Sequence, residues 1–550
     1  MAPEVDIDVR AAAEAWLADD PDPAARAELR ELIDRLPATA GELADRFAGP
    51  LTFGTAGLRG RLRAGPNGMN LAVVTRAAAG LVGWLAEQGG TGPLVIGYDA
   101  RHGSREFAEQ TARVATGAGR EALLLPAVLP TPVLAYAVRA LDAVAGVMVT
   151  ASHNPPQDNG YKVYLGARLG GPAGDGAQIV PPADAGIEAA IRGVASAAGV
   201  PLGDAGTVLD DKILAGYVDR AAAVLDVAGP RDLTVAYTPL HGVGGGTLVA
   251  AFAAAGFAAP AVVADQAEPD PEFPTVAFPN PEEPGAMDHL VALAGRTGAD
   301  LAIANDPDAD RCAVAVPGPD GAWRPLRGDE LGVLLADHLI RRGTPGTYAT
   351  TIVSSSLLGR LCAARGVPYA ETLTGFKWIV RAAEDLAFGY EEALGYCVAP
   401  AMVRDKDGIT AALTVAELAA GLKTEGRTLA DRLDELAVEF GVHATDQLSV
   451  RVDDLAEIGA AMGRARSNPP ATLRGAPVTE VTDRLPENDV LTFRTPSTRV
   501  VIRPSGTEPK LKAYLEVVEP VAGDDVAAAR SRASAGLATL RAEIAAVLGV

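Results

Sequence analysis

Cysteine, histidine and aromatic residues are scarce in this chain. Its 550 residues include three cysteines and six histidines, and aromatic residues make up only 5%. Cys312, Cys362 and Cys397 form no CxxC pair and cannot all pair with one another. These features argue against a disulfide framework, and we expect a reducing, cytoplasmic setting.

Positive charge and long hydrophobic runs are also in short supply. The 48 Lys and Arg residues face 70 Asp and Glu residues, for a net charge of −22. A general nucleic-acid partner needs a basic face and is not expected, although a pocket for a small anion can be locally basic. The most apolar stretch, 248–264, contains Pro260 and is shorter than the ~20 residues of a membrane helix. A buried helix followed by a strand explains it better. The acidic N-terminal stretch has no apolar signal segment, so no membrane partner is expected.

Short apolar runs alternate with Ala-rich helical stretches over most of the chain. We expect strands at 93–98, 122–125, 145–150, 233–237, 301–304 and 348–353. The helices expected between them lie at 104–117, 247–255, 331–340 and 357–365, and Ser104 is the expected N-cap of the first. This alternation is typical of α/β proteins and predicts three doubly wound mixed-sheet α/β domains.

The two ends of the chain have a different pattern of predicted helices and strands. Helices with one polar face are expected at 11–18 and 23–36, and the last hundred residues predict an α+β domain with an antiparallel sheet. Its expected strands lie at 447–452, 478–481, 490–494 and 498–502, before a long helix from about residue 525. A single linker near 440–446 is expected to act as its hinge. The predicted parts are therefore 1–48, 49–205, 206–320, 321–443 and 444–550.

The segment 150–164, TASHNPPQDNGYKVY, follows a predicted buried strand. Ser152 therefore lies at the carboxyl end of that strand, where open α/β sheets place their reactive loops. A serine becomes a nucleophile only beside a base or a metal, and His153 and Lys162 are near in sequence. The alternative is a Ser/Asn/Pro turn that closes the strand.

The segment 306–311, DPDADR, carries three carboxylates at alternate positions. Asp306, Asp308 and Asp310 suit a hard divalent cation, which prefers oxygen ligands. An EF-hand is excluded because Arg311 stands where that loop needs glycine. A solvated acidic loop is the alternative.

Two further loops carry groups for a sugar phosphate. In GYEEALGY, 389–396, Glu391 and Glu392 could accept hydrogen bonds from sugar hydroxyls, and Lys406 in DKDG, 405–408, could meet a phosphate. The alternative is an exposed acidic turn. The loop RPSGTEPKLK, 503–512, has the composition of a phosphate cradle but lacks the Walker GK[ST] sequence. Its candidate residues are Arg503, Ser505, Gly506 and Thr507, and a plain strand-end turn is the alternative.

Weaker signals lie in two other segments. Arg59 follows glycines in FGTAGLRG, 53–60, and could touch a phosphate. The segment TGFKWI, 374–379, places Thr374, Gly375 and Lys377 near a possible sugar site, although its aromatic pair is more typical of a core. The four histidines without metal-ligand spacing are expected to be structural: His102, His289, His338 and His443.

Taken together, these loops resemble those of the α-D-phosphohexomutase family. The four main motifs follow that family's order and spacing across about residues 50–515. The resemblance implies four domains around a central cleft, with a phosphoserine, a Mg²⁺ ion, a sugar-recognition loop and a phosphate-binding loop. FGTAGLRG, TGFKWI and the chain length look like the phosphoglucomutase and phosphopentomutase branch. Ala393 departs from the pattern, because the family usually has a hydroxyl-bearing serine there.

The resemblance also implies roles for the candidate residues. Ser152 would carry the phosphoryl group and join Asp306, Asp308 and Asp310 around Mg²⁺. His153 and Lys162 would assist proton transfer, and Arg59 and Arg311 would stabilise the transferring group. The remaining candidates would bind the substrate: Thr374, Gly375, Lys377, Glu391, Glu392, Lys406, Arg503, Ser505, Gly506 and Thr507.

The function implied is that of a phosphoglucomutase. Such an enzyme interconverts glucose 1-phosphate and glucose 6-phosphate, with glucose 1,6-bisphosphate as intermediate and activator. The same chemistry on pentose or mannose phosphates is the nearest alternative. A non-catalytic sugar-phosphate sensor and a Mg²⁺-dependent phosphatase are more distant ones. The sequence favours a hexose or pentose phosphate as the partner and indicates no particular oligomeric state.

Overall fold

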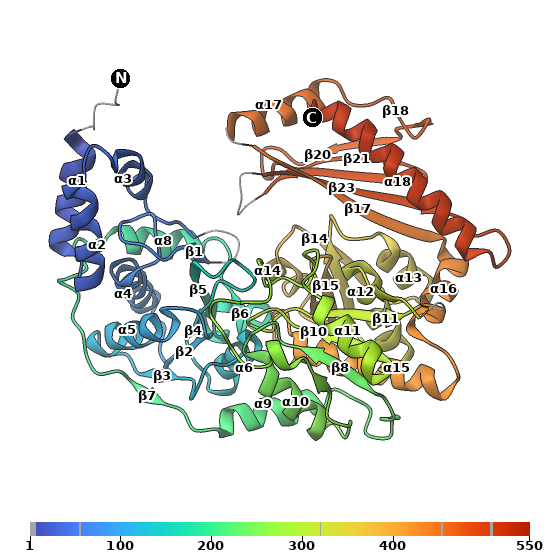
Figure 1. The fold of residues 1–550 in the computed structure, drawn as a ribbon, viewed down its shortest axis with the longest axis horizontal. Helices are drawn as coiled ribbons and strands as arrows, with labels where there is room; N and C mark the ends of the chain where they lie inside the picture. Colours follow the sequence, from blue (N-terminus) through green and yellow to red (C-terminus); the bar gives the residue numbers. More distant parts are fainter. Residues whose placement is uncertain (1–6, 54–56, 319–320, 453–454, 506–509) are drawn as a thin grey trace.

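Three helices lie at the start of the described chain (Figure 1). The computed structural model describes residues 7–53, 57–318, 321–452, 455–505 and 510–550. The three helices are α1 (Ile7–Asp19), α2 (Pro23–Asp34) and α3 (Ala40–Arg46). The Asp22 carboxylate caps α2, and Pro23 occupies its first turn, where a missing N–H costs nothing. Both N-terminal helices expected from the sequence are present, and α2 ends two residues before the predicted limit.

The first large sheet is mixed, with seven strands in the order β1-β5-β4-β2-β3-β7 and β6 paired to β5. Its central strands β2, β3 and β4 run parallel, whereas β5 pairs antiparallel with β4 and β1. Both β2 and β4 are buried along their whole length, as expected for strands covered on both faces. The strands are β1 (Leu58–Arg61), β2 (Leu94–Tyr98), β3 (Ala122–Leu124), β4 (Ala145–Val149), β5 (Asp158–Leu165), β6 (Ala177–Gln178) and β7 (Thr207–Val208). The accompanying helices are α4 (Leu71–Glu87), α5 (Ser104–Gly117), α6 (Thr131–Ala140), α7 (Ala167–Gly170) and α8 (Ala183–Arg192).

The second and third sheets are also mixed, in the orders β12-β11-β10-β8-β9 and β14-β13-β15-β16. In the second sheet β9, β8 and β10 run parallel, and β11 and β12 add antiparallel pairings at one edge. In the third, β14, β13 and β15 run parallel, and β16 adds an antiparallel pairing at one edge. The second comprises α9 (Lys212–Ala222), β8 (Val235–Thr238), α10 (Gly244–Ala254), β9 (Ala261–Val262), α11 (Asp288–Thr297), β10 (Leu301–Ala304), β11 (Ala313–Pro317) and β12 (Trp323–Pro325). The third comprises α12 (Gly328–Arg341), β13 (Thr347–Thr351), α13 (Leu357–Arg365), β14 (Tyr369–Thr372), α14 (Phe376–Ile379), β15 (Leu386–Glu391), β16 (Gly395–Cys397), α15 (Gly408–Thr424) and α16 (Leu429–Phe440). Residues of both sheets share one hydrophobic core.

The fourth sheet is wholly antiparallel, in the order β17-β23-β22-β21-β20, and the long helix α18 packs on it (Figure 1). The predicted fold class is therefore confirmed: three mixed α/β sheets precede an α+β part. The strand at 510–519 was not predicted from the sequence. The elements are β17 (Val442–Arg451), α17 (Leu455–Ser467), β18 (Thr472–Leu473), β19 (Ala476–Pro477), β20 (Glu480–Asp483), β21 (Leu491–Thr495), β22 (Thr498–Pro504), β23 (Lys510–Glu519) and α18 (Val526–Leu548). Among the described residues, we find no helix whose length and apolarity would suit a membrane span.

A buried carboxylate, Glu516 of β23, joins the fourth sheet to the third. It accepts hydrogen bonds from Ser355 Oγ and Ser356 N, both at 2.8 Å, and it lies 3.0 Å from His443 Nδ1. Arg499 Nε lies 3.1 Å from its second oxygen. Burial opposes the charged carboxylate, but Arg499 and His443 outweigh burial and hold the pKa of Glu516 well below its usual value. Glu516 therefore stays ionised at neutral pH.

Replacing Glu516 with glutamine is expected to lower the free energy of unfolding by about 3–5 kcal/mol, because Arg499 is left buried without its partner. Since the folded pKa is depressed, the stabilisation by Glu516 is present above the unfolded value near 4.5 and is lost as pH falls below it. Urea unfolding of the wild type should therefore lose stability below about pH 5 more steeply than that of Glu516→Gln. The exposed Glu480→Gln should stay within about 0.5 kcal/mol of wild type. Equal stability of both variants at pH 7 would contradict this account.

Candidate active site

Ser152 lies just beyond the carboxyl end of β4 and is 2% exposed. Its φ of 52° is in the left-handed region, which a non-glycine residue adopts only when its surroundings hold it there. The Oγ atom donates to Asp306 Oδ2 at 2.8 Å and lies 3.1 Å from His153 Nδ1. The hydroxyl therefore faces both the acidic loop and a ring nitrogen.

The three aspartates follow β10, which is parallel to β8. Each aspartate offers one carboxylate oxygen, and these three oxygens lie within 4.8 Å of one another. All three side chains are buried. Lys162 of β5 reaches this group, with Nζ 2.7 Å from Asp308 Oδ2 and 3.0 Å from Asp310 Oδ2. The structure thus brings together Ser152, Lys162 and the complete acidic motif.

The donor set fits the Mg²⁺ ion that the resemblance implies. Asp308 Oδ2 is held by Lys162 and by Thr131 Oγ1, the latter at 2.6 Å, and Asp310 Oδ2 is held by Lys162 and Lys406. The other oxygens, Asp308 Oδ1 and Asp310 Oδ1, are buried and have no hydrogen-bond partner among the described residues. Each of these two carboxylates therefore keeps one oriented, unpartnered oxygen, which is the ligand type that Mg²⁺ prefers.

The charges around this motif shift its titration in opposite directions. Burial, then repulsion from Asp308 and Asp310, raises the pKa of Asp306 well above its usual value. Burial also acts on Asp308, but the Lys162 ammonium outweighs it and lowers the pKa of that carboxyl. Burial and the nearby cations of Arg311 and Arg59 hold the pKa of His153 well below its usual value, so the imidazole is neutral.

Two arginines flank the serine and the acidic motif. Arg59 of β1 donates from Nη1 to Asn154 Oδ1 at 3.4 Å. The Arg311 backbone N–H donates to Asp306 Oδ1 at 3.0 Å, and its Nε lies 4.0 Å from Asp306 Oδ2. Arg311 Nη1 also lies 3.6 Å from Glu282 Oε2. Cationic side chains thus lie close to the Ser152 loop and the acidic motif.

The acidic pair Glu391 and Glu392 lies at the end of β15, and the two carboxylates have different surroundings. Glu391 ends β15, and burial raises its pKa. Glu392 accepts from Ser354 Oγ at 3.0 Å and Thr351 Oγ1 at 3.3 Å, and burial together with Glu391 raises its pKa to about 7. Lys406 Nζ lies 3.2 Å from Asp310 Oδ2, which connects this part of the site to the acidic motif.

The other predicted substrate-binding residues lie in two places. Thr374 and Gly375 precede α14, and the Lys377 ammonium lies 5.9 Å from the Trp378 ring centroid, with Asp184 and Arg381 as its charged neighbours. Arg503 is the last residue but one of β22 and lies beside Tyr514, whose charged neighbours also include Glu391 and Glu392. The backbone N–H of Ser505 donates to Lys510 O at 2.8 Å. The predictions for Gly506 and Thr507 lie outside the described residues.

Comparison with known proteins identifies four successive matches. The models of the phosphoglucomutase/phosphomannomutase alpha/beta/alpha domains I, II and III match residues 50–197, 215–319 and 327–440. The model of the C-terminal domain matches residues 448–533. Together these matches cover more than half of the chain. The chain belongs to the phosphoglucomutase/phosphomannomutase family.

Known members of this family resemble the chain over most of its length. A "Probable phosphomannomutase" of Haemophilus influenzae is 47% identical over 457 residues, 82% of this chain and 93% of its own. A "Phosphopentomutase" of Mus musculus is 34% identical, over 93% of this chain and 90% of its own. A "Phosphoglucomutase" of Staphylococcus aureus is 33% identical, over 88% and 93%. The crystal structure of a putative phosphomannomutase from Thermus thermophilus covers 89% of this chain and 99% of its own, with a TM-score of 0.69 and 27% identity. This member of the family is therefore a phosphomutase enzyme acting on sugar phosphates.

Sequence reasoning missed several residues of this candidate site. Thr131 begins α6 and donates to Asp308, and Asp405 accepts from Tyr164 OH at 2.9 Å and Gln178 Nε2 at 2.8 Å. Arg101 donates to the backbone of the Ser152 loop. Its only signal in the sequence is its place just after the apolar strand β2, where reactive loops gather.

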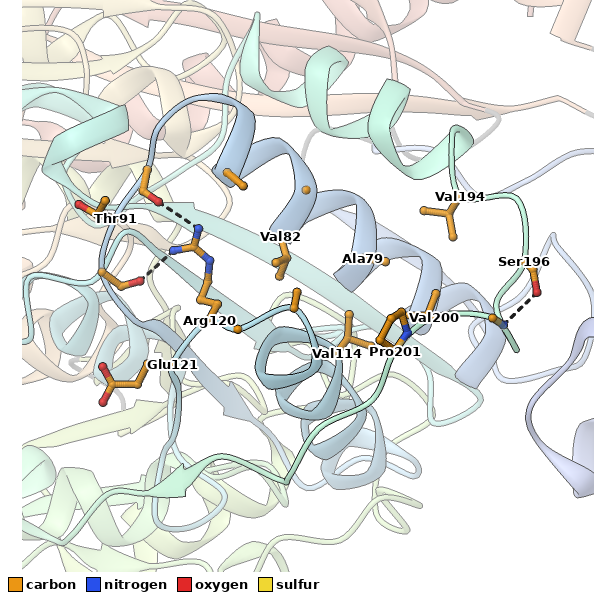
Figure 2. A pocket seen from close by; sticks show the side chains of 17 residues that line it. Ala79, Val82, Thr91, Val114, Arg120, Glu121, Val194, Ser196, Val200 and Pro201 are labelled. Carbon is orange, nitrogen blue, oxygen red and sulfur yellow. Dashed lines mark hydrogen bonds between the residues drawn. The ribbon is translucent and has the colours of Figure 1, made fainter.

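A separate hollow of about 770 Å³ lies between α4, α5 and the segment after α8 (Figure 2). Its labelled lining residues include Val82, Val114 and Val200, and the Arg120 guanidinium donates to the Gly90 and Gly92 carbonyls at 3.0 and 2.9 Å. Within the described part of the chain, none of the predicted site residues lines this hollow. The hollow is therefore separate from the group formed by Ser152, Lys162 and the three aspartates.

Proposed function

We propose that the enzyme interconverts glucose 1-phosphate and glucose 6-phosphate through a phosphorylated Ser152 and glucose 1,6-bisphosphate. The observation that carries the proposal is the 2.8 Å contact between Ser152 Oγ and Asp306 Oδ2, inside a buried group that also contains Lys162. A serine hydroxyl needs such neighbours to exchange a phosphoryl group.

The first transfer moves the phosphoryl group from Ser152 to the sugar. The bond between phosphorus and Ser152 Oγ breaks while a bond forms to the free hydroxyl oxygen of the sugar phosphate, which gives the bisphosphate. The hydroxyl proton passes to the neutral imidazole of His153, which lies beside Ser152 Oγ, and from there to the departing Ser152 oxygen. Lys162 assists this transfer as an ammonium, by stabilising the negative charge that develops next to the acidic motif. After the bisphosphate reorients, its other phosphoryl group returns to Ser152 Oγ, and the freed sugar oxygen regains the proton. Each cycle therefore regenerates phosphorylated Ser152.

The metal and the arginines would offset the negative charge of the phosphoryl group during these transfers. Asp306, Asp308 and Asp310 would hold Mg²⁺ together with an oxygen on Ser152. Bound there, Mg²⁺ would offset charge on the transferring group. Arg59 and Arg311 would add fixed cations beside the same group. A phosphoryl group leaving Ser152 would thus stay surrounded by positive charge.

The remaining candidates would hold the non-reacting end of the substrate. Arg503, Ser505, Gly506 and Thr507 would grip its phosphate in either orientation, since an arginine fork and backbone N–H groups suit a phosphate. Carboxylates would accept hydrogen bonds from the sugar hydroxyls, and these bonds would orient the ring near α14. For this part of the site we propose Thr374, Gly375, Lys377, Glu391, Glu392 and Lys406.

Relative rates on three sugars test the preferred substrate. Glucose 1-phosphate, mannose 1-phosphate and ribose 1-phosphate would be compared with Mg²⁺ and catalytic amounts of the matching bisphosphate. We expect kcat/KM for glucose 1-phosphate to exceed the others by at least about tenfold. A highest rate with mannose or ribose would replace the proposal by a phosphomannomutase or a phosphopentomutase, the activities named for the Haemophilus influenzae and Mus musculus relatives. Steady release of inorganic phosphate without an acceptor sugar would instead favour a phosphatase.

A further inference from the structure

One buried arginine holds both ends of the loop that carries Ser152. Arg101, 4% exposed, donates from Nη2 to the carbonyls of Ser152 and Asn154, both at 2.6 Å. From Nη1 it donates to the carbonyls of Pro155 and Asp158 at 2.8 and 3.1 Å. A single planar guanidinium therefore spans the loop from the reactive serine to the start of β5.

Arg101 is itself held by Asp99, a residue two positions before it in the sequence. Its Nε lies 3.4 Å from Asp99 Oδ2, and Asp99 Oδ1 accepts from the Arg101 backbone N–H at 3.0 Å and from Ser104 Oγ at 2.6 Å. The Asn159 side chain donates in turn to Ser104 Oγ at 2.9 Å. These contacts fix the guanidinium before any substrate binds.

The loop between β9 and α11 packs against the other face of the Arg101 guanidinium. The Arg101 guanidinium lies 4.9 Å from the ring centroid of Phe273. Three residues before Phe273, the Asp270 N–H donates to His241 O at 3.0 Å, and Val243 N donates to Pro307 O at 2.8 Å. Pro307 lies between two of the aspartates, so Arg101 is connected both to the serine loop and to the domain that carries the acidic motif.

We propose that Arg101 is a positioning residue for phosphoryl transfer. By binding the carbonyl of Ser152 itself, it keeps the left-handed backbone of that residue in place and so aims Oγ at the aspartates and the sugar hydroxyl. This inference rests on the proposed function, because it needs Ser152 to be the phosphoryl carrier. Arg101 acts through the loop backbone and binds no part of the sugar.

The test compares Arg101→Lys with a matched variant, Arg231→Lys. Arg231 also donates to three backbone carbonyls, those of Ala255, Pro230 and Asp226, and lies 5.0 Å from the Phe257 ring, but it is remote from Ser152 in the second domain. A lysine retains the charge in both variants but has no guanidinium fork. Arg231→Lys therefore reports the general cost of losing a guanidinium fork that binds backbone carbonyls.

The readouts are kcat, KM for glucose 1-phosphate and the single-turnover rate at which glucose 1,6-bisphosphate phosphorylates Ser152. For Arg101→Lys we expect kcat and the single-turnover rate to fall by about 10²-fold, with KM within about twofold of wild type. Arg231→Lys should keep all three values. Wild-type rates in Arg101→Lys, or equal losses in both variants, would overturn the inference.

Two further outcomes are decided in the same experiment. If Arg101→Lys does not fold, Phe273→Leu, which retains Arg101 but removes the ring against it, should still lower the single-turnover rate by about tenfold without changing KM. An unchanged rate in Phe273→Leu would then overturn the inference. If wild-type protein places no phosphate on Ser152, the proposed function fails and the role of Arg101 fails with it. If wild type does so and Arg101→Lys is equally fast, only the role of Arg101 is overturned.

Discussion

Replacing Ser152 with alanine is expected to lower kcat by at least about 10⁴-fold, because the variant has no oxygen to carry the phosphoryl group between the two halves of the reaction. The small side chain should leave the fold intact, since the backbone contacts of the loop with Arg101 do not involve the hydroxyl. The measurement is glucose 6-phosphate formation from glucose 1-phosphate with Mg²⁺ and glucose 1,6-bisphosphate present.

Ser196→Ala is the control for this variant. The Ser196 hydroxyl donates to Asp19 in the N-terminal helices and lies in the wall of the separate hollow (Figure 2), so its loss should leave kcat unchanged. The thermal unfolding midpoint of both variants would be recorded to show that they are folded. Wild-type turnover by Ser152→Ala in the presence of bisphosphate would contradict the assignment of Ser152.

The second large effect is expected for Asp308→Asn. This change preserves the shape of the side chain but removes the charge that balances Lys162, 2.7 Å away. It also makes a poorer metal ligand of the oxygen that has no hydrogen-bond partner in the described part of the chain. We expect Mg²⁺ to bind more weakly and kcat at saturating Mg²⁺ to fall by about 10³-fold, since a metal supplies several kcal/mol of charge stabilisation. Kinetics over a Mg²⁺ titration and calorimetric Mg²⁺ binding measure the two effects separately.

Asp300→Asn gives the matched control, because Asp300 lies directly before β10 while Asp308 lies beyond its other end. Asp300 forms an ion pair with Lys423 at 2.9 Å on the surface, and its replacement should change neither Mg²⁺ binding nor kcat. Chelation by EDTA should abolish wild-type activity, and added Mg²⁺ should restore it. Full activity of Asp308→Asn, or of wild type in EDTA, would rule out the metal role of the motif.

Local patterns predicted much of the secondary structure. The strand 301–304 and the helix 357–365 are found with the predicted limits, because each is an apolar or Ala-rich run with clear turn residues beside it. The N-cap prediction for Ser104 was wrong: Gly103 precedes the helix, and Ser104 is its first residue and donates to Asp99. The strand 510–519 was missed because its lysine-rich start was interpreted only as part of a phosphate loop.

The site was predictable where chemistry is carried by contiguous side chains. Ser152 and the acidic motif follow buried strands, so their meeting at the carboxyl ends of two sheets could be anticipated. Arg101 could not be found in this way, because its partners are backbone carbonyls more than fifty residues away, which leave no pattern of side chains. The sugar preference also depends on contacts that no single motif encodes. The effect of Ala393 on that preference is tested by the comparison of rates on the three sugars.

The most direct test of the account follows one phosphoryl group through the enzyme. Protein treated with glucose 1,6-bisphosphate and Mg²⁺ would be digested and the phosphorylated peptide sequenced, and a second portion would be chased with glucose 1-phosphate. We predict one phosphoryl group on Ser152, and in the chase its transfer to the sugar to form the bisphosphate at a rate no slower than kcat. Phosphate on another residue, or its release as inorganic phosphate without transfer to the sugar, would contradict the account.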